Sequence, residues 1–197
     1  MMKFERSQCP QWLSENWERW SRQWQAKRQN PKKRNDWQWY TYRGRKVNEL
    51  LLPLLSALTK NHCSFCDKRP IGVETVDHFK PKSSYPLESY NWENLFIACY
   101  DCQASRWENY EDILLKPDEL GYEFNRYFLY DFDLGELNPR GEEDSAEYLR
   151  ADFTIKTFKL NERGLPEARK IISDNLSAFK AMDINKVPYR FIFGIFE

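Results

Sequence analysis

The sequence has no excess charge of either sign, few histidines and no long apolar run. Its 197 residues include 30 Lys and Arg against 30 Asp and Glu, so the formal net charge is zero. This balance excludes a uniformly basic surface that coats nucleic acid, although it leaves the distribution of charge open. Only two histidines occur, His62 and His78, so chemistry that requires an imidazole depends on one of them.

Long apolar segments are also missing. The longest apolar run, LLLPLLSAL at residues 50–58, is too short to span a bilayer and contains Pro53. The first residues, MMKFERSQCPQW, lack the apolar core of a secretory signal. We therefore expect a cytoplasmic protein, in which thiols stay reduced and paired cysteines indicate metal more often than disulfide.

What is present is typical of one globular domain with a modest extension. Residues 1–60 carry thirteen Lys and Arg against five Asp and Glu, whereas residues 111–150 carry four against twelve. The basic residues of segment 1–60 can face phosphate or an acidic partner. They can also be ordinary solvated helix surface, and this second case is the commoner one.

Three regions follow from hydrophobic spacing and charge. Residues 1–60 predict a basic, Trp-rich helical N-terminal region, residues 61–110 a metal-stabilised core, and residues 111–197 an acidic loop region followed by helix that packs on the core or on a partner. The overall fold class is expected to be α+β and predominantly helical.

The N-terminal region predicts two helices. Leu13, Trp17, Trp20 and Trp24 form one helical stripe, a pattern more typical of a core or a partner interface than of a base-stacking platform. A second helix over residues 47–58 shows leucine-rich spacing, and Pro53 either bends it or lies in its first turns.

The C-terminal region predicts a strand and a helix. Phe153, Ile155 and the segment ending at Leu160 alternate as a short strand does, and Pro166 opens a last helix that extends to Met182. The tail YRFIFGIFE is either a buried final strand or a surface for another subunit.

Four of the five cysteines form two identical pairs, Cys63-x-x-Cys66 and Cys99-x-x-Cys102. Two such pairs complete a tetrahedral four-thiolate shell for Zn2+, and the alternatives are a redox pair or four buried thiols. Because thiolates fill all four positions, this zinc cannot activate water and is structural. Cys9 stands alone as an ordinary thiol.

The segment between the pairs predicts two strands. Val73 to Phe79 suits a strand that ends at Asp77-His78, and Asn94-Leu95 leads a second strand to the second pair, after which a helix can begin. Strand, long loop, strand and helix is the sequence shape of a ββα-metal nuclease motif.

The stretches CSFC, VDHFKPKS and YNWENLFIACYDC resemble the HNH endonuclease superfamily. In detail they are similar to the HNH subunit of Septu-type anti-phage systems and to related HNH proteins encoded beside some retrons. The resemblance runs over roughly residues 47–170, and it includes Ala151 to Ile155, Leu160-Asn161, Leu165 and Arg169.

The resemblance implies a role for each matching residue. His78 matches the general base that takes a proton from water, and Asp77 matches the carboxylate that holds a catalytic Mg2+ or Mn2+. Asn94 matches the residue that braces the loop between the strands. Gln103 and Arg106 stand where the family usually has Asn and Lys, so Gln103 becomes the second metal ligand and Arg106 a phosphate clamp.

Further positive charge lies beside this motif. Lys80, Lys82 and Ser83 follow His78 where a scissile phosphate needs cations and hydroxyl donors. The segment from Lys32 to Lys46 interleaves basic and aromatic residues and is a candidate nucleic-acid track.

The expected function is a nuclease subunit that cuts DNA, with a partner ATPase of the ABC/SMC-like class implied by the Septu resemblance. The retron resemblance adds a reverse transcriptase and its RNA–DNA product as partners. One alternative is a non-catalytic, zinc-stabilised adaptor that binds nucleic acid or the ATPase. Another is an enzyme that cuts RNA, including tRNA, because water and not the 2′-hydroxyl is the nucleophile.

Overall fold

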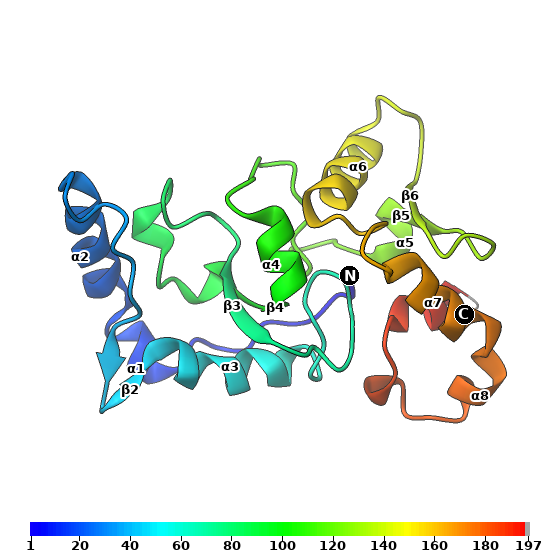
Figure 1. The fold of residues 1–197 in the computed structure, drawn as a ribbon, viewed down its shortest axis with the longest axis horizontal. Coiled ribbons are helices and arrows are strands. Elements are labelled where there is room, and N and C mark those ends of the chain that lie inside the picture. The colour runs from blue at the N-terminus through cyan, green and yellow to red at the C-terminus, as the bar shows by residue number, and fades with distance from the viewer. Residues whose placement is uncertain (196–197) are drawn as a thin grey trace.

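The computed structural model describes residues 1–195, which form helices and small two-stranded sheets (Figure 1). The helices are α1 (Gln11–Ser14), α2 (Trp17–Gln29), α3 (Val47–Leu58), α4 (Tyr100–Arg106), α5 (Phe124–Tyr127), α6 (Ala146–Phe158), α7 (Leu165–Asp174) and α8 (Leu176–Lys180). Short 3-10 turns are η1 (Pro86–Glu88), η2 (Trp92–Asn94), η3 (Ile184–Lys186) and η4 (Arg190–Ile195). The strands are β1 (Thr41–Tyr42), β2 (Arg45–Lys46), β3 (Glu74–His78), β4 (Leu95–Cys99), β5 (Phe128–Tyr130) and β6 (Leu137–Pro139).

The N-terminal helices bury the predicted stripes. The predicted single stripe is divided, with Leu13 on α1 and Trp17, Trp20 and Trp24 on α2. Trp17 is half-buried and the other three are buried. The helix predicted over residues 47–58 is confirmed as α3, which buries Leu51 and Leu55. Pro53 lies inside α3 with its ring exposed, and the helix continues through it.

The central hairpin is antiparallel. β3 pairs with β4 so that Asp77 lies opposite Phe96 and His78 lies opposite Leu95. Every residue of β4 is buried, because α3 and α4 both pack against the hairpin. Figure 1 shows α3 along one side of these strands and α4 along the other. The predicted order of strand, strand and helix is present.

The strand predicted over residues 153–160 is wrong, because these residues belong to α6 and the turn after it. The side chain of Ser145 accepts a hydrogen bond from the Tyr148 backbone N–H and so caps the helix. Ala151, Thr154 and Phe158 are buried at helical spacing, while the alternation that suggested a strand involves half-buried positions.

The predicted last helix is divided. α7 begins at Leu165 with Pro166 in its first turn and ends at Asp174, and α8 is separate. The tail is not a strand, since Arg190–Ile195 form η4 with Phe191 and Ile192 buried. The last two residues of the tail, 196–197, lie outside the described residues.

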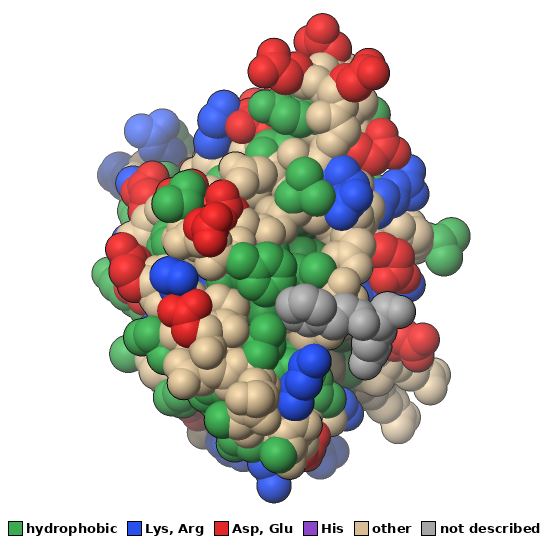
Figure 2. All heavy atoms as spheres, turned by 90° about the vertical axis from the view of Figure 1, so that its right-hand side faces the viewer, with side chains coloured by type: hydrophobic (Ala, Val, Ile, Leu, Met, Phe, Trp, Pro, Cys, Tyr) green, Lys and Arg blue, Asp and Glu red, His purple; other side chains and the backbone are tan. Residues whose placement is uncertain are grey.

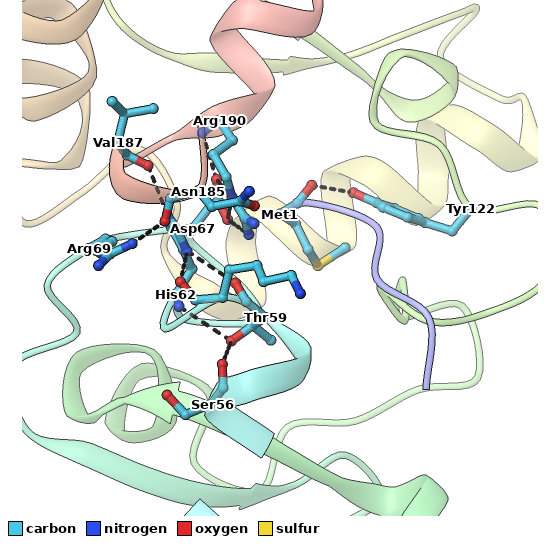
Figure 3. Close-up of polar contacts among 11 residues, drawn as sticks. Met1, Ser56, Thr59, His62, Asp67, Arg69, Tyr122, Asn185, Val187 and Arg190 are labelled. Atoms are coloured by element: carbon cyan, nitrogen blue, oxygen red, sulfur yellow. Dashed lines mark hydrogen bonds and ion pairs between the residues drawn. The ribbon is translucent and has the colours of Figure 1, made fainter. Parts of the chain in front are cut away.

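Polar contacts hold the C-terminal turns against the first cysteine pair (Figure 3). The Asp67 carboxylate accepts hydrogen bonds from the backbone and guanidinium of Arg190, with a shortest ion-pair distance of 2.6 Å. The ring of His62 is fully buried, and its Nε2 lies 2.8 Å from the Val187 carbonyl oxygen. His62 therefore serves the packing of these turns.

Buried residues from all three regions of the sequence belong to one hydrophobic cluster. Acidic side chains gather at one end of the molecule, over the loop between β6 and α6 that carries Glu142, Glu143 and Asp144 (Figure 2). Within residues 1–195, no helix has the length and apolar character needed to cross a membrane.

Candidate functional site

The four paired cysteines meet at one point. Their Sγ atoms all lie within 4.8 Å of one another, and all four residues are buried. Cys63 and Cys66 come from the turn after α3, Cys99 ends β4, and Cys102 lies in the first turn of α4. The backbone N–H of Cys99 points at Sγ of Cys63, and that of Cys102 points at Sγ of Cys99, as in metal-binding turns.

The spacing of these sulfurs fits a metal ion. Zn–S bonds of about 2.3 Å in a tetrahedron place the sulfurs about 3.8 Å apart. Sγ of Cys66 and Cys99 lie 3.8 Å apart. Hydrogen bonds from Cys102, Cys63 and Cys66 lower the pKa of Cys99, whereas those with Cys63, Cys66 and Cys99 raise the pKa of Cys102. Without a cation, the four cysteines thus favour a single thiolate. A cation such as Zn2+ would balance the charge of four thiolates.

A second site lies along one side of α4. A cavity of about 290 Å3 opens there, beside the end of β3. Its lining brings together five of the predicted site residues from two elements and one loop: Asp77, His78, Lys82, Gln103 and Arg106. Pro81, Tyr100, Ala104, Trp107 and Glu108 complete the lining.

The ring of His78 is fixed by three contacts. Its Nε2 lies 2.9 Å from the Ser89 carbonyl oxygen, so Nε2 carries the proton and donates it to that oxygen. Trp39 stacks on the ring with 5.2 Å between centroids, and Trp37 meets it edge-on at the same centroid distance. Nδ1 has no hydrogen-bond partner within residues 1–195, which leaves its lone pair free.

Burial also sets the protonation of His78. Its side chain is only 4% exposed. Burial lowers the pKa of His78 well below its usual value, and the positive charge of Lys82 acts in the same direction. The hydrogen bond to the Ser89 carbonyl oxygen opposes this shift but does not cancel it. The imidazole is therefore neutral at pH 7, the form in which Nδ1 can accept a proton.

Asn94 ties the loop between the two strands to the hairpin. Its Oδ1 accepts a hydrogen bond from the Lys80 backbone N–H at 2.6 Å, and its Nδ2 donates to the carbonyl oxygens of Lys80 and Glu88, each at 3.0 Å. Ser89, the partner of His78, directly follows this anchored loop. The amide of Asn94 thus fixes the segment that positions the imidazole.

Arg106 is turned into the protein and not toward a phosphate. Its guanidinium is 1% exposed and lies 2.9 Å from the Asp77 carboxylate. It also donates hydrogen bonds to the carbonyl oxygens of His78 and Phe79. The position expected to clamp a phosphate instead joins the end of α4 to the end of β3.

The remaining predicted residues divide between the cavity and its surroundings. Gln103 donates from Nε2 to the Val76 carbonyl oxygen at 3.2 Å, which leaves its Oε1 without a partner in the described chain. Lys82 lines the cavity with its Nζ 5.3 Å from the Trp37 ring centroid, and burial lowers the pKa of Lys82. Lys80 and Ser83 do not line the cavity; Lys80 lies over Tyr85.

Comparison with known proteins adds one relative. No protein-family model matches the sequence. The chain is similar to the Septu protein PtuB of Bacillus mycoides (strain KBAB4). The two are 25% identical over 167 residues, an alignment that covers 68% of this chain and 54% of PtuB. The chain thus spans about half the length of the curated relative it matches.

The sequence interpretation missed the aromatic surroundings of His78. Trp37 and Trp39 belong to the segment that was predicted as a nucleic-acid track, yet both contact the imidazole. It also missed Tyr100 and Trp107, which line the cavity. Their spacing along α4 could have indicated this, because residues seven apart share one helix face.

Proposed function

We propose that this chain is a metal-dependent nuclease subunit of the HNH, or ββα-metal, type that acts in anti-phage defence. The observation that carries the proposal is that His78 and Asp77, at the end of β3, line one cavity, with Nε2 of His78 held by the Ser89 carbonyl oxygen and Nδ1 without a partner in the described chain. Similarity to a Septu protein supports the defence role.

His78 acts as the general base in this proposal. Its Nδ1 takes a proton from a water molecule in the cavity, and the resulting hydroxide attacks the phosphorus of the phosphodiester. The P–O bond to the leaving sugar oxygen breaks, and that oxygen takes a proton from solvent. The stacked ring of Trp39 and the Ser89 carbonyl oxygen keep the lone pair in one direction. Asn94 acts through the loop that carries Ser89 and is a positioning residue.

Asp77 and Gln103 are the residues that would hold Mg2+ or Mn2+. One oxygen of Asp77 already accepts from Arg106, so its other oxygen and Oε1 of Gln103 are the donors left. Two protein ligands suit Mg2+, which keeps several waters and takes phosphate oxygens from substrate. Such an ion supplies positive charge that stabilises the transition state and the leaving oxygen.

The four cysteines hold structural Zn2+ in this proposal, and they fasten the start of α4 to the turn after α3. DNA is the proposed substrate, and an ABC/SMC-like ATPase is the proposed partner in the cytoplasm. A retron reverse transcriptase with its RNA–DNA product belongs to the same proposal as a further partner.

A second candidate function is a zinc-stabilised adaptor without catalysis. The observation that favours it is the buried pairing of Asp77 with Arg106, which satisfies part of the carboxylate without any metal ion. An enzyme that cuts RNA uses the same residues as one that cuts DNA, so these two differ only in substrate.

Nicking of supercoiled plasmid in Mg2+ and in Mn2+ tests the proposal. We expect nicking by the wild-type chain and by Lys170→Ala, a variant on the surface of α7. We expect none by His78→Gln, which keeps a polar side chain of similar size beside Ser89 and should retain cooperative unfolding. Single-stranded DNA and tRNA assayed in parallel separate the substrates. Absence of metal-dependent cleavage of all three favours the adaptor, and equal cleavage by wild type and His78→Gln contradicts the role of His78.

A further inference from the structure

One face of α4 runs along the rim of the cavity. Tyr100, Gln103 and Ala104 lie at i, i+3 and i+4 on one face of α4, Trp107 directly follows the last residue of the helix, and all four line the cavity with His78. The first and last of these four residues are aromatic. Tyr100 is 60% exposed and Trp107 is 79% exposed.

These two rings differ from the other large aromatics of the central region, such as Trp92 and Tyr90, which are buried. Neither Tyr100 nor Trp107 makes a ring–ring or cation–π contact within residues 1–195. A single exposed aromatic needs no explanation, but two on the rim of a candidate active site indicate a ligand with flat, apolar faces.

The backbone at Trp107 turns its ring outward. Its φ of 51° and ψ of −115° lie in a region that bulky residues rarely adopt. The side chain of Arg106, one residue earlier, points into the protein. The indole of Trp107 points toward solvent. Strain of this kind is concentrated at functional sites and here maintains the exposure of the indole.

We propose that Tyr100 and Trp107 form a stacking platform for unpaired bases on either side of the scissile phosphate, so that the strand is unpaired where it is cut. This rests on the nuclease function proposed above. Tyr100 begins α4 and Trp107 follows its last residue, so their backbones lie about 10 Å apart along the helix axis, and both line the cavity. Bases in a duplex stack on each other and do not present free faces to protein rings.

Charge at the cavity favours stacking over phosphate attraction as the source of affinity. Asp77 and Glu108 bring negative charge to the lining, and Lys82 and Arg106 bring positive charge, so the lining is balanced. Exposed basic residues lie further out, in the segment 32–34 that leads to Trp37. Every base has a flat face, so the platform selects unpaired strands and not a sequence.

Binding measurements without added Mg2+ or Mn2+ test the platform, using fluorescence anisotropy with labelled dT12, U12 and a 12-base-pair duplex. We expect the wild-type chain to bind both single strands more tightly than the duplex. Trp107→Ala should weaken single-strand binding about 5- to 150-fold, while Trp107→Phe retains most of it. Leu120→Ala, at a fully exposed residue outside the cavity, is the matched control and should bind as wild type does.

Salt dependence separates stacking from phosphate contact. Trp107→Ala should leave the slope of log affinity against log salt unchanged, whereas Lys82→Ala should reduce that slope by about one. Equal single-strand binding by wild type and Trp107→Ala overturns the platform, and so does wild-type preference for duplex or failure to bind either single strand.

The outcome is distinguishable from failure of the nuclease function. If nicking depends on His78 but single-strand binding does not depend on Trp107, the platform alone is wrong. If single-strand binding depends on Trp107 and no substrate is cut, the chain binds nucleic acid as an adaptor and the nuclease proposal is wrong.

Discussion

The guanidinium of Arg106 lies 2.9 Å from the carboxylate of Asp77, with the two side chains 1% and 5% exposed. The same guanidinium donates to the carbonyl oxygens of His78 and Phe79. Such additional hydrogen bonds offset part of the cost of burying an ion pair, and here they satisfy Nη1 and Nη2 of Arg106 while its Nε has no partner in the described chain. This pair therefore fixes the end of β3, where the proposed base and metal ligand are adjacent in sequence.

Replacement of Arg106 by Ala should lower the free energy of unfolding by about 3–5 kcal/mol, because the Asp77 carboxylate is left buried without its partner. Urea unfolding measures this loss. Lys170→Ala is the matched control, since it breaks an exposed i,i+4 pair with Asp174 and should change stability by about 0.5 kcal/mol or less. Wild-type stability in Arg106→Ala contradicts this account of the pair.

Loss of the four-cysteine metal site should unfold the hairpin region and not merely lower activity. We expect one Zn2+ per chain by elemental analysis, and loss of both zinc and cooperative unfolding in Cys99→Ser, because metal binding contributes directly to folding. Cys9→Ser should retain zinc and wild-type unfolding, since Cys9 lies outside the four-cysteine group. A zinc-free, cooperatively folded Cys99→Ser protein would refute the structural role.

Asn94→Ala should abolish metal-dependent nicking while zinc content stays unchanged. Its amide makes three hydrogen bonds that hold the loop carrying Ser89. Each backbone group of that loop left buried without a partner lowers the free energy of unfolding by about 1–3 kcal/mol. Nicking and zinc content measured on one preparation decide this. Asn109→Ala, at an exposed amide that bonds Thr157, should nick at the wild-type rate.

Stability should fall with acid through His78. Burial lowers the pKa of His78 below its usual value of about 6.5, so between these two pKa values the unfolded chain binds a proton that the folded chain does not. Stability from the neutral imidazole is thus present above pH 6.5 and decreases as pH falls. Urea unfolding from pH 7.5 to 5.0 should show a shallower decrease in His78→Gln than in wild type, and parallel curves would contradict the shift.

The parts of the fold that sequence predicts are those with a local signal. The leucine spacing of residues 47–58 specifies α3, and the paired cysteines specify which four sulfurs meet. The segment around Phe153 predicts a strand because Phe153 and Ile155 are apolar and two apart, but in the structure both are half-buried positions of α6. Ser145, which caps α6, was the missed helix signal.

The parts that sequence does not predict depend on packing between distant segments. The inward turn of Arg106 requires the carbonyl oxygens of His78 and Phe79 to face α4, and no local pattern reveals this. The contacts of Trp37 and Trp39 with His78 likewise join segments about forty residues apart in sequence. The side chains that set the environment of the imidazole therefore emerge only in three dimensions.

The seven residues of α4 have one further consequence. Cys99 and Cys102 hold the beginning of the helix in the four-cysteine group. Their position therefore fixes the direction in which each later side chain of α4 points. Each residue rotates that direction by about 100°. One residue inserted between Cys102 and Gln103 would leave all four sulfurs in place and yet turn the Gln103–Trp107 face away from the cavity. The packing of the four cysteines thus sets the orientation of the side chains with which α4 lines the cavity.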